Sequence, residues 1–250
     1  MQSIILTLVP ENREPLNLNL NMASLFHGAL MEFAESAFAE IMHAHGLKPY
    51  SQYIRRGENK GEWHWRINAL TDESFDKLAV PLLNDELNTL ELKKKNIKLK
   101  IIKKEIGEKI TIEDLIRRFY INSSTNRRIK LRFITPCAFK TEGRYEFFPH
   151  ISLIYQSLIN RMDSFAAKIS VKDEAAFKHL CENTRIIDYK LKSCRFSLEG
   201  VKIPSFLGEI IIRIDGPETL VSLSNLLLNY ALWSGIGIKT ALGMGGIDIG

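Results

Sequence analysis

The order of the predicted strands and helices restricts the fold of this chain more than any other feature, because it recurs in both halves. Each half opens with a strand, crosses to a long helix, returns to strands and has a second helix later. The opening strands are predicted at Ser3–Val9 and Ile129–Phe139, where β-branched and apolar residues are frequent. This β-α-β-β-α-β order is that of a ferredoxin-like unit. The sequence therefore predicts an α+β, RRM-like protein of two ferredoxin-like units in tandem.

Apolar periodicity gives the expected bounds of the other elements, since a repeat of three or four residues indicates a helix and alternation indicates a strand. The first long helix is predicted over Leu16–His45, with Gly46 as its C-cap residue. Alternation is clearest where Trp63, Trp65 and Ile67 are interleaved with polar residues. The other predicted strands are Lys48–Arg56, Glu62–Leu70, Leu87–Ile106 (an edge strand or a pair), Arg185–Leu198, Gly208–Ile214 and Ile247–Ile249, and the other predicted helices are Thr71–Leu83, Thr111–Tyr120, Ile151–Phe165, Asp173–Cys181 and Leu220–Trp233.

A polar stretch without periodicity, Asn122–Asn126, lies near the middle of the chain and predicts a domain boundary. The expected domains are residues 1–125 and 126–250. The net charge of +5 allows an acidic partner such as nucleic acid. Three widely spaced cysteines suggest neither a disulfide framework nor a zinc site, and so indicate a reducing cytoplasm. No apolar run approaches the roughly 20 residues that span a bilayer, so we expect a soluble protein.

A glycine-rich segment, residues 235–246, follows the last predicted helix and contains one lysine, Lys239. Glycine allows positive φ and close approach of another backbone, and consecutive N–H groups in such loops can surround phosphate oxygens. No helix starts after the segment, so it is neither a P-loop nor a dinucleotide-binding loop. It is either a phosphate-binding loop of another kind or an ordinary glycine-rich turn between helix and strand.

Four stretches taken together resemble the CRISPR repeat-RNA endoribonucleases of the repeat-associated mysterious protein (RAMP) superfamily, whose members are tandem ferredoxin-like folds. The glycine-rich segment is similar to the C-terminal signature of that family. The other stretches are Leu131–Lys140 with Gly143–Tyr145 and Phe148–Pro149, the helical segment Ser157–Arg161, and Ile41–Ser51, which includes two histidines.

This resemblance implies cleavage of repeat RNA at one phosphodiester, without a metal ion or other cofactor. The 2′-hydroxyl attacks the adjacent phosphorus and leaves a 2′,3′-cyclic phosphate and a 5′-hydroxyl. Histidine suits the proton transfers because its unperturbed pKa is about 6.5, and lysine or backbone N–H groups can stabilise the charge that develops on phosphorus. The expected partner is CRISPR repeat RNA, and the product is expected to reach a separate interference complex. Whether the protein forms a homodimer stays open.

The resemblance assigns His43 as the general acid or base, and a slip of one residue in the comparison would exchange it with His45. The alternative for His43 is an exposed histidine that interacts with the helix dipole. His27, early in the same predicted helix, is expected either to serve as a second acid–base group or to be a structural histidine. Lys140 is expected near the domain interface as a phosphate contact, with a solvated lysine as the alternative.

The predicted RNA-binding residues lie in the glycine-rich segment and in the strand after the first helix. They are Gly235, Gly237, Lys239, Gly243, Gly245, Gly246, Lys48 and Tyr50. The lysine-rich run from Lys93 to Lys104 is either an electrostatic track for RNA or a solvated face.

Two other functions compete with the endoribonuclease. One is a non-catalytic RNA-binding subunit of an interference complex. The other is an unrelated enzyme that binds a phosphate ligand with the glycine-rich segment.

Overall fold

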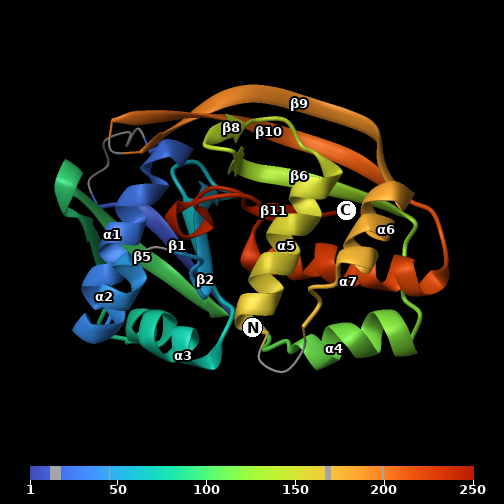
Figure 1. Cartoon of the computed structure of the whole chain (residues 1–250). Coiled ribbons are helices and arrows are strands. Elements are labelled where there is room, and N and C mark those ends of the chain that lie inside the picture. The colour runs from blue at the N-terminus through green and yellow to red at the C-terminus, as the bar shows by residue number, and fades with distance from the viewer. Residues whose placement is uncertain (12–17, 45, 167–169, 199) are drawn as a thin grey trace.

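The structure is a computed structural model that describes residues 1–11, 18–44, 46–166, 170–198 and 200–250 (Figure 1). Its strands form two main antiparallel sheets and a small two-stranded sheet. In Figure 1 the first main sheet lies at the left with α1, α2 and α3, and the second lies at the right with α5, α6 and α7. No helix in these ranges is both long and apolar enough to cross a membrane.

The first sheet has the strand order β2-β3-β1-β5-β4. Without β4, this is the antiparallel order of a ferredoxin-like unit, and α1 and the α3 region supply its two helices. The strands are β1 (Gln2–Pro10), β2 (Tyr50–Arg56), β3 (Trp63–Ala69), β4 (Thr89–Leu92) and β5 (Ile97–Ile106), and the helices are α1 (Ala23–Phe33), α2 (Ser36–His43) and α3 (Asp72–Ser74), with short turns η1 (Leu20–Met22), η2 (Phe75–Ala79), η3 (Val80–Leu83) and η4 (Lys93–Lys95).

The second sheet has the order β11-β6-β10-β9, the same arrangement built from the second half of the chain. The prediction of tandem ferredoxin-like units is confirmed. The strands of the second sheet are β6 (Arg128–Cys137), β9 (Thr184–Leu198), β10 (Val201–Ile214) and β11 (Ile247–Ile249). The small sheet pairs β7 (Phe139–Thr141) with β8 (Arg144–Glu146). The helices of this half are α5 (Ile151–Phe165), α6 (Glu174–Asn183) and α7 (Glu218–Ser234), with a 3₁₀ helix, η6, at Thr240–Leu242.

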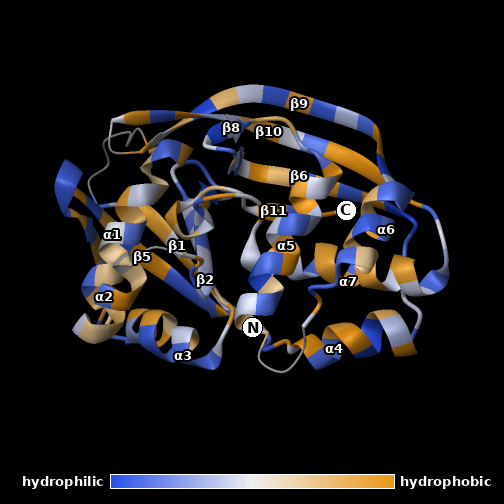
Figure 2. Ribbon diagram, viewed as in Figure 1, coloured by the Kyte–Doolittle hydropathy of each residue, from blue (hydrophilic) through white to orange (hydrophobic). Residues whose placement is uncertain are grey.

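Each sheet covers a hydrophobic core of its own. In β3 the alternation places Trp63, Trp65 and Ile67 in the first core, where Phe26 of α1 packs edge-to-face on Trp65 with ring centroids 5.2 Å apart. In the second core α7 is buried along most of its length, and Figure 2 shows it largely hydrophobic. The long strand β9 is mostly exposed, as expected for an edge strand.

The two halves of the chain exchange elements across the predicted boundary. Helix α4 (Ile112–Ile116) and the following turn η5 (Arg117–Ile121) belong to the first half, yet Leu115 and Phe119 pack in the second core. Conversely, Phe196 and Ile203 from the β9–β10 hairpin pack in the first core. The boundary between residues 125 and 126 therefore stays a prediction, although it falls between η5 and β6.

The single helix predicted over residues 16–45 is wrong, because the chain breaks into α1 and α2. Ala34 (ψ 148°) and Glu35 (ψ 137°) are extended, which ends one helix and starts the next. Gly46 is not the C-cap either, since α2 ends at His43 with Ala44 as its C-cap. Residues 12–17 lie outside the described part of the chain. The predicted strand over residues 87–106 is a pair in which β4 is the edge and β5 is interior.

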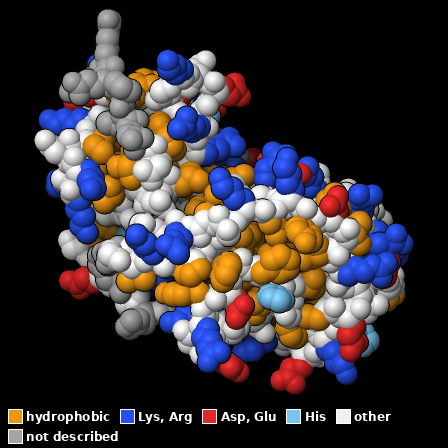
Figure 3. Space-filling view, turned by 90° about the horizontal axis from the view of Figure 1, so that it is seen from above, with side chains coloured by type: hydrophobic (Ala, Val, Ile, Leu, Met, Phe, Trp, Pro, Cys, Tyr) orange, Lys and Arg blue, Asp and Glu red, His pale blue; other side chains and the backbone are white. Residues whose placement is uncertain are grey.

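Basic side chains are dispersed over the face of the molecule that Figure 3 shows. Figure 3 shows Lys and Arg bordering exposed hydrophobic side chains, with Asp and Glu between them. On the second sheet Lys130 lies 2.9 Å from Glu209, and Arg185 lies 2.9 Å from Asp215. These pairs are partly open to solvent, which limits what each contributes to stability.

Candidate active site

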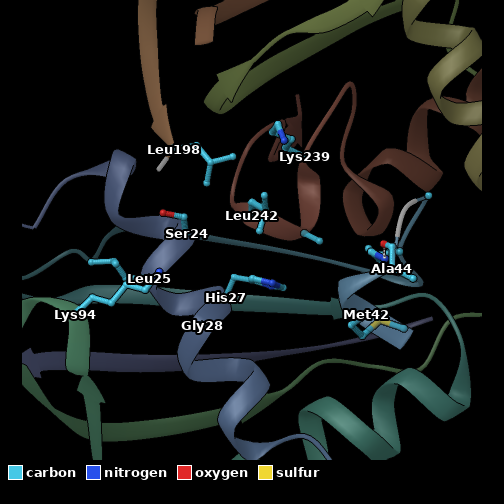
Figure 4. A pocket seen from close by; sticks show the side chains of 13 residues that line it. Ser24, Leu25, His27, Gly28, Met42, Ala44, Lys94, Leu198, Lys239 and Leu242 are labelled. Carbon is cyan, nitrogen blue, oxygen red and sulfur yellow. Dashed lines mark hydrogen bonds between the residues drawn. The ribbon is translucent and has the colours of Figure 1, made fainter. Parts of the chain in front are cut away.

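A pocket of about 640 Å³ lies where α1, the end of α2, the glycine-rich segment and the end of β9 meet. Figure 4 shows His27 extending into it from α1, Lys239 and Leu242 contributed by the glycine-rich segment, and Met42 and Ala44 at the end of α2. Lys48, Lys94 and Lys239 all line this pocket. One histidine and three lysines therefore line a single pocket at the junction of the two sheets.

His27 is held by Tyr50, a fully buried residue of β2. The Tyr50 hydroxyl lies 2.8 Å from Nδ1 of His27, and the two rings are nearly parallel, with centroids 6.3 Å apart. Burial raises the pKa of the Tyr50 hydroxyl, which stays protonated at neutral pH. The side chain of Tyr50 is covered and bonds His27, and its predicted contact with RNA stays a prediction.

The end of α2 borders the same pocket. His43 is the last residue of α2, and Met42, Ala44 and Gly46 line the pocket on either side of it. The His43 side chain and the whole of His45 lie outside the described part of the chain. The structure thus brings the backbone that carries the predicted catalytic histidine to the pocket that contains His27.

Lys48 stabilises the C-terminal end of α2. Its ammonium donates hydrogen bonds to the carbonyl oxygens of Ala44 and Ile41, the latter at 3.4 Å. A cation at this position offsets the partial negative charge of the helix C-terminus. Desolvation lowers the pKa of the Lys48 ammonium. Lys48 therefore lines the pocket and holds the helix end that carries His43.

The backbone N–H groups of the glycines in the segment are bonded within the protein. All five glycines are buried. Gly237 donates to Ser157 Oγ at 2.9 Å, and Gly246 donates to Thr135 Oγ1 at 2.8 Å. Gly235, Gly243 and Gly245 donate to the carbonyls of Ala231, Thr240 and Pro136. The RNA-binding role of these glycines stays a prediction.

Two of the glycines are points of close approach, Gly243 to the other half of the chain and Gly245 within the segment itself. A Cβ atom on Gly243 (φ 101°) would lie 2.1 Å from Cβ of Ala23, the first residue of α1. One on Gly245 (φ 65°) would lie 1.9 Å from the carbonyl oxygen of Ile236. The segment thus packs tightly on α1, and Lys239, left-handed at φ 55° and exposed, reaches the pocket.

Lys140 does not reach the pocket. It lies on β7, exposed, with its ammonium 5.7 Å from the ring centre of Tyr145. The residue does not line the described pocket, so the expected phosphate contact is not supported. In the lysine-rich run, Lys94 lines the pocket, while Lys93 pairs with Glu32 at 2.8 Å. The role of Lys140 stays a prediction, and Lys94, which the sequence did not single out, lines the pocket.

Cys137 lies beneath the glycine-rich segment, with its thiol 3.4 Å from the carbonyl oxygen of Ile236. Complete burial raises the pKa of this thiol well above its ordinary value, which disfavours the reactive thiolate.

We expect a disulfide reagent at about pH 8 to label the partly exposed Cys181 and Cys194 before Cys137, as measured by mass spectrometry of peptides. Labelling of Cys137 as fast as Cys194 would show that the junction opens readily.

Several solved structures share this fold. A Cas6 product complex superimposes with a TM-score of 0.79 at 22% identity, covering 100% of this chain and 98% of that one. Thermus thermophilus Cas6 gives 0.73 at 23% identity, covering 99% and 97%. A RAMP protein that binds different RNA substrates gives 0.64 at 14% identity, covering 100% and 99%. The chain therefore has the fold of these Cas6 and RAMP proteins.

Sequence comparisons identify the family of this chain. The family model for CRISPR-associated endoribonuclease Cas6 matches residues 131–247. The Cas6 endoribonuclease of Streptococcus thermophilus is 32% identical over 231 residues, covering 92% of this chain and 91% of that protein. The Mycobacterium tuberculosis protein of the same description is 28% identical over 224 residues, covering 89% and 70%. The chain belongs to the CRISPR-associated endoribonuclease Cas6 family, and the protein is an RNA endonuclease.

Proposed function

We propose that this protein matures CRISPR RNA in the cytoplasm by cutting each repeat once, without a metal ion. The products would carry a 2′,3′-cyclic phosphate and a 5′-hydroxyl. One observation carries the proposal: His27, Lys239 and the two residues that flank His43, Met42 and Ala44, all line one pocket. Solved relatives are described as a product complex and a substrate mimic complex, which supports RNA as the occupant of this pocket.

The proposed reaction needs two proton transfers and a stabilised phosphorus centre. A base removes the proton of the 2′-hydroxyl, the 2′-oxygen bonds to phosphorus, and the bond from phosphorus to the 5′-oxygen breaks. An acid then donates a proton to that leaving oxygen. His43 and His27 are the proposed acid–base pair, with His45 as the alternative to His43. Lys239 is the proposed cation for the negative charge that develops on the phosphoryl oxygens.

His27 is suited to this role by its contact with Tyr50. Because Nδ1 faces the Tyr50 hydroxyl at 2.8 Å, Nε2 is the nitrogen that would exchange a proton with RNA. RNA supplies its own nucleophile, so no serine or cysteine nucleophile is required. Lys48 and Lys94 would contribute further positive charge around the phosphates, which positions RNA but does not read its sequence.

The test is cleavage of a labelled repeat RNA in EDTA, followed by analysis of the ends. A single cut with a 2′,3′-cyclic phosphate, abolished by a 2′-deoxy substitution at the cut site, is the expected result. RNA binding without any cut would favour the non-catalytic subunit. A cut that requires added metal or leaves a 3′-hydroxyl would overturn the proposed mechanism.

Replacing Tyr50 with phenylalanine should slow cleavage about three- to tenfold, because the ring packing is retained while one hydrogen bond to His27, worth about 0.5–1.5 kcal/mol, is lost. The measurement is the single-turnover rate at saturating protein. Tyr155→Phe is the matched control, since it removes a buried hydroxyl that bonds Thr184 and Ser224 in the second core. Equal rates for the two variants would argue that Tyr50 does not orient His27.

A further inference from the structure

Gln52 is a fully buried polar side chain of β2 that lies between two walls of the pocket. Its amide nitrogen donates to the carbonyl oxygens of Ala23, at 3.0 Å, and Ala241, at 3.2 Å. Its amide oxygen accepts from the indole N–H of Trp65 at 2.9 Å. Both amide hydrogens and the oxygen are therefore used, as a buried amide requires.

The two carbonyl groups belong to the elements that carry the proposed catalytic side chains. Ala23 is the first residue of α1, one turn before His27, and Ala241 is two residues after Lys239. These segments are far apart in the sequence and come from opposite halves of the chain. Gln52 thus bonds at once to the histidine-bearing helix and to the lysine-bearing segment.

Trp65 fixes which way the amide of Gln52 faces. A flipped amide would place its oxygen against two carbonyl oxygens and its NH₂ group against the indole N–H, leaving all these groups unpaired. Unpaired polar groups in a buried site are costly. Since one orientation alone satisfies every group, the separation between Ala23 and Ala241 is held by directional bonds as well as by packing.

We propose that Gln52 is a positioning residue of the active site, which holds His27 and Lys239 against the same phosphate of the bound RNA. This inference rests on the proposed function. Gly243 lets the glycine-rich segment approach Ala23, whereas Gln52 fixes the position of the segment along α1. Loss of Gln52 would leave each side chain in the pocket but allow the segment to shift relative to α1, and small displacements of this kind lower reaction rates strongly.

The experiment compares Gln52→Met with Asn225→Leu. Asn225 is an equally buried amide, but it bonds Asn126 and Val221 on the far side of the second core. For Gln52→Met we expect a loss of at least tenfold in the single-turnover rate, with RNA affinity within twofold of wild type. Asn225→Leu should lower the melting temperature to a similar degree and leave the rate of the folded protein unchanged.

A double-mutant cycle with Lys239→Ala separates positioning from general stability. If Gln52 acts through Lys239, the rate losses of Gln52→Met and Lys239→Ala will not multiply in the double variant. Multiplying losses, or equal rates for Gln52→Met and Asn225→Leu, would overturn the inference. Trp65→Phe is the second variant, because it leaves Gln52 in place and removes the indole donor that orients the amide, together with some ring volume from the first core; it should give a smaller loss of the same kind. Absence of cleavage by the wild type would instead contradict the proposed function.

Discussion

Gly243→Ala is expected to destabilise the protein by about 2–5 kcal/mol and to abolish cleavage under conditions where the wild type cuts. The new Cβ would lie 2.1 Å from Cβ of Ala23, so α1 and the glycine-rich segment would have to separate. Overpacking of this kind costs about 1–3 kcal/mol, and the left-handed φ of 101° adds about 1–2 kcal/mol for a residue with a side chain. Thermal unfolding would show a fall in melting temperature of about 10 °C.

Gly143→Ala is the matched control for this prediction. Gly143 also has a positive φ, 80°, but a Cβ at that position meets nothing within 4 Å. It therefore measures the backbone strain alone, and we expect a small loss of stability with full cleavage activity. Equal losses for the two variants would mean that φ strain, and not the contact with Ala23, explains the need for Gly243.

His27→Ala and His43→Ala are each expected to slow cleavage by about 10²–10⁴-fold, the usual contribution of general acid–base catalysis. The affinity for RNA should stay within about threefold, because neither imidazole is proposed to anchor the substrate. Single-turnover rates at saturating protein separate the two quantities. The double variant should lose little more than either single one, since the proton transfers act as a unit.

His179→Ala is the control, since this histidine is exposed on α6 away from the pocket. A normal rate for His43→Ala together with a severe loss for His45→Ala would move the proposed role to His45. A normal rate for His27→Ala would make His27 a structural partner of Tyr50, and the second catalytic group would then have to be sought elsewhere in the pocket.

The periodic elements were accessible from the sequence because their signals are local. Helix α5 follows its predicted bounds, and the alternation in β3 correctly placed Trp63, Trp65 and Ile67 in the core. The β-α-β-β-α-β order was enough to predict the tandem fold, since short connections and right-handed crossovers leave few other arrangements of the strands. The break between α1 and α2 escaped prediction because Ala34 and Glu35 carry no local signal for extended backbone.

The candidate site was likewise only partly predictable from the sequence. Residue types suited to the chemistry, His27, His43 and Lys239, were visible in the sequence, because imidazole and ammonium groups have chemical properties that do not depend on the fold. The glycine-rich segment was also visible, but not its packing: its N–H groups bond internally, and Gly243 allows contact with Ala23 from the other half of the chain.

Local pattern and residue chemistry thus specified the two ferredoxin-like units and most of the candidate groups. Tertiary structure alone decided that Tyr50 is a buried partner of His27, that Lys140 lies outside the pocket, and that Gln52 joins its two walls. The physical reason is that burial and hydrogen-bond partners depend on residues up to about 200 positions apart, and no periodicity along the chain records which of those residues will meet.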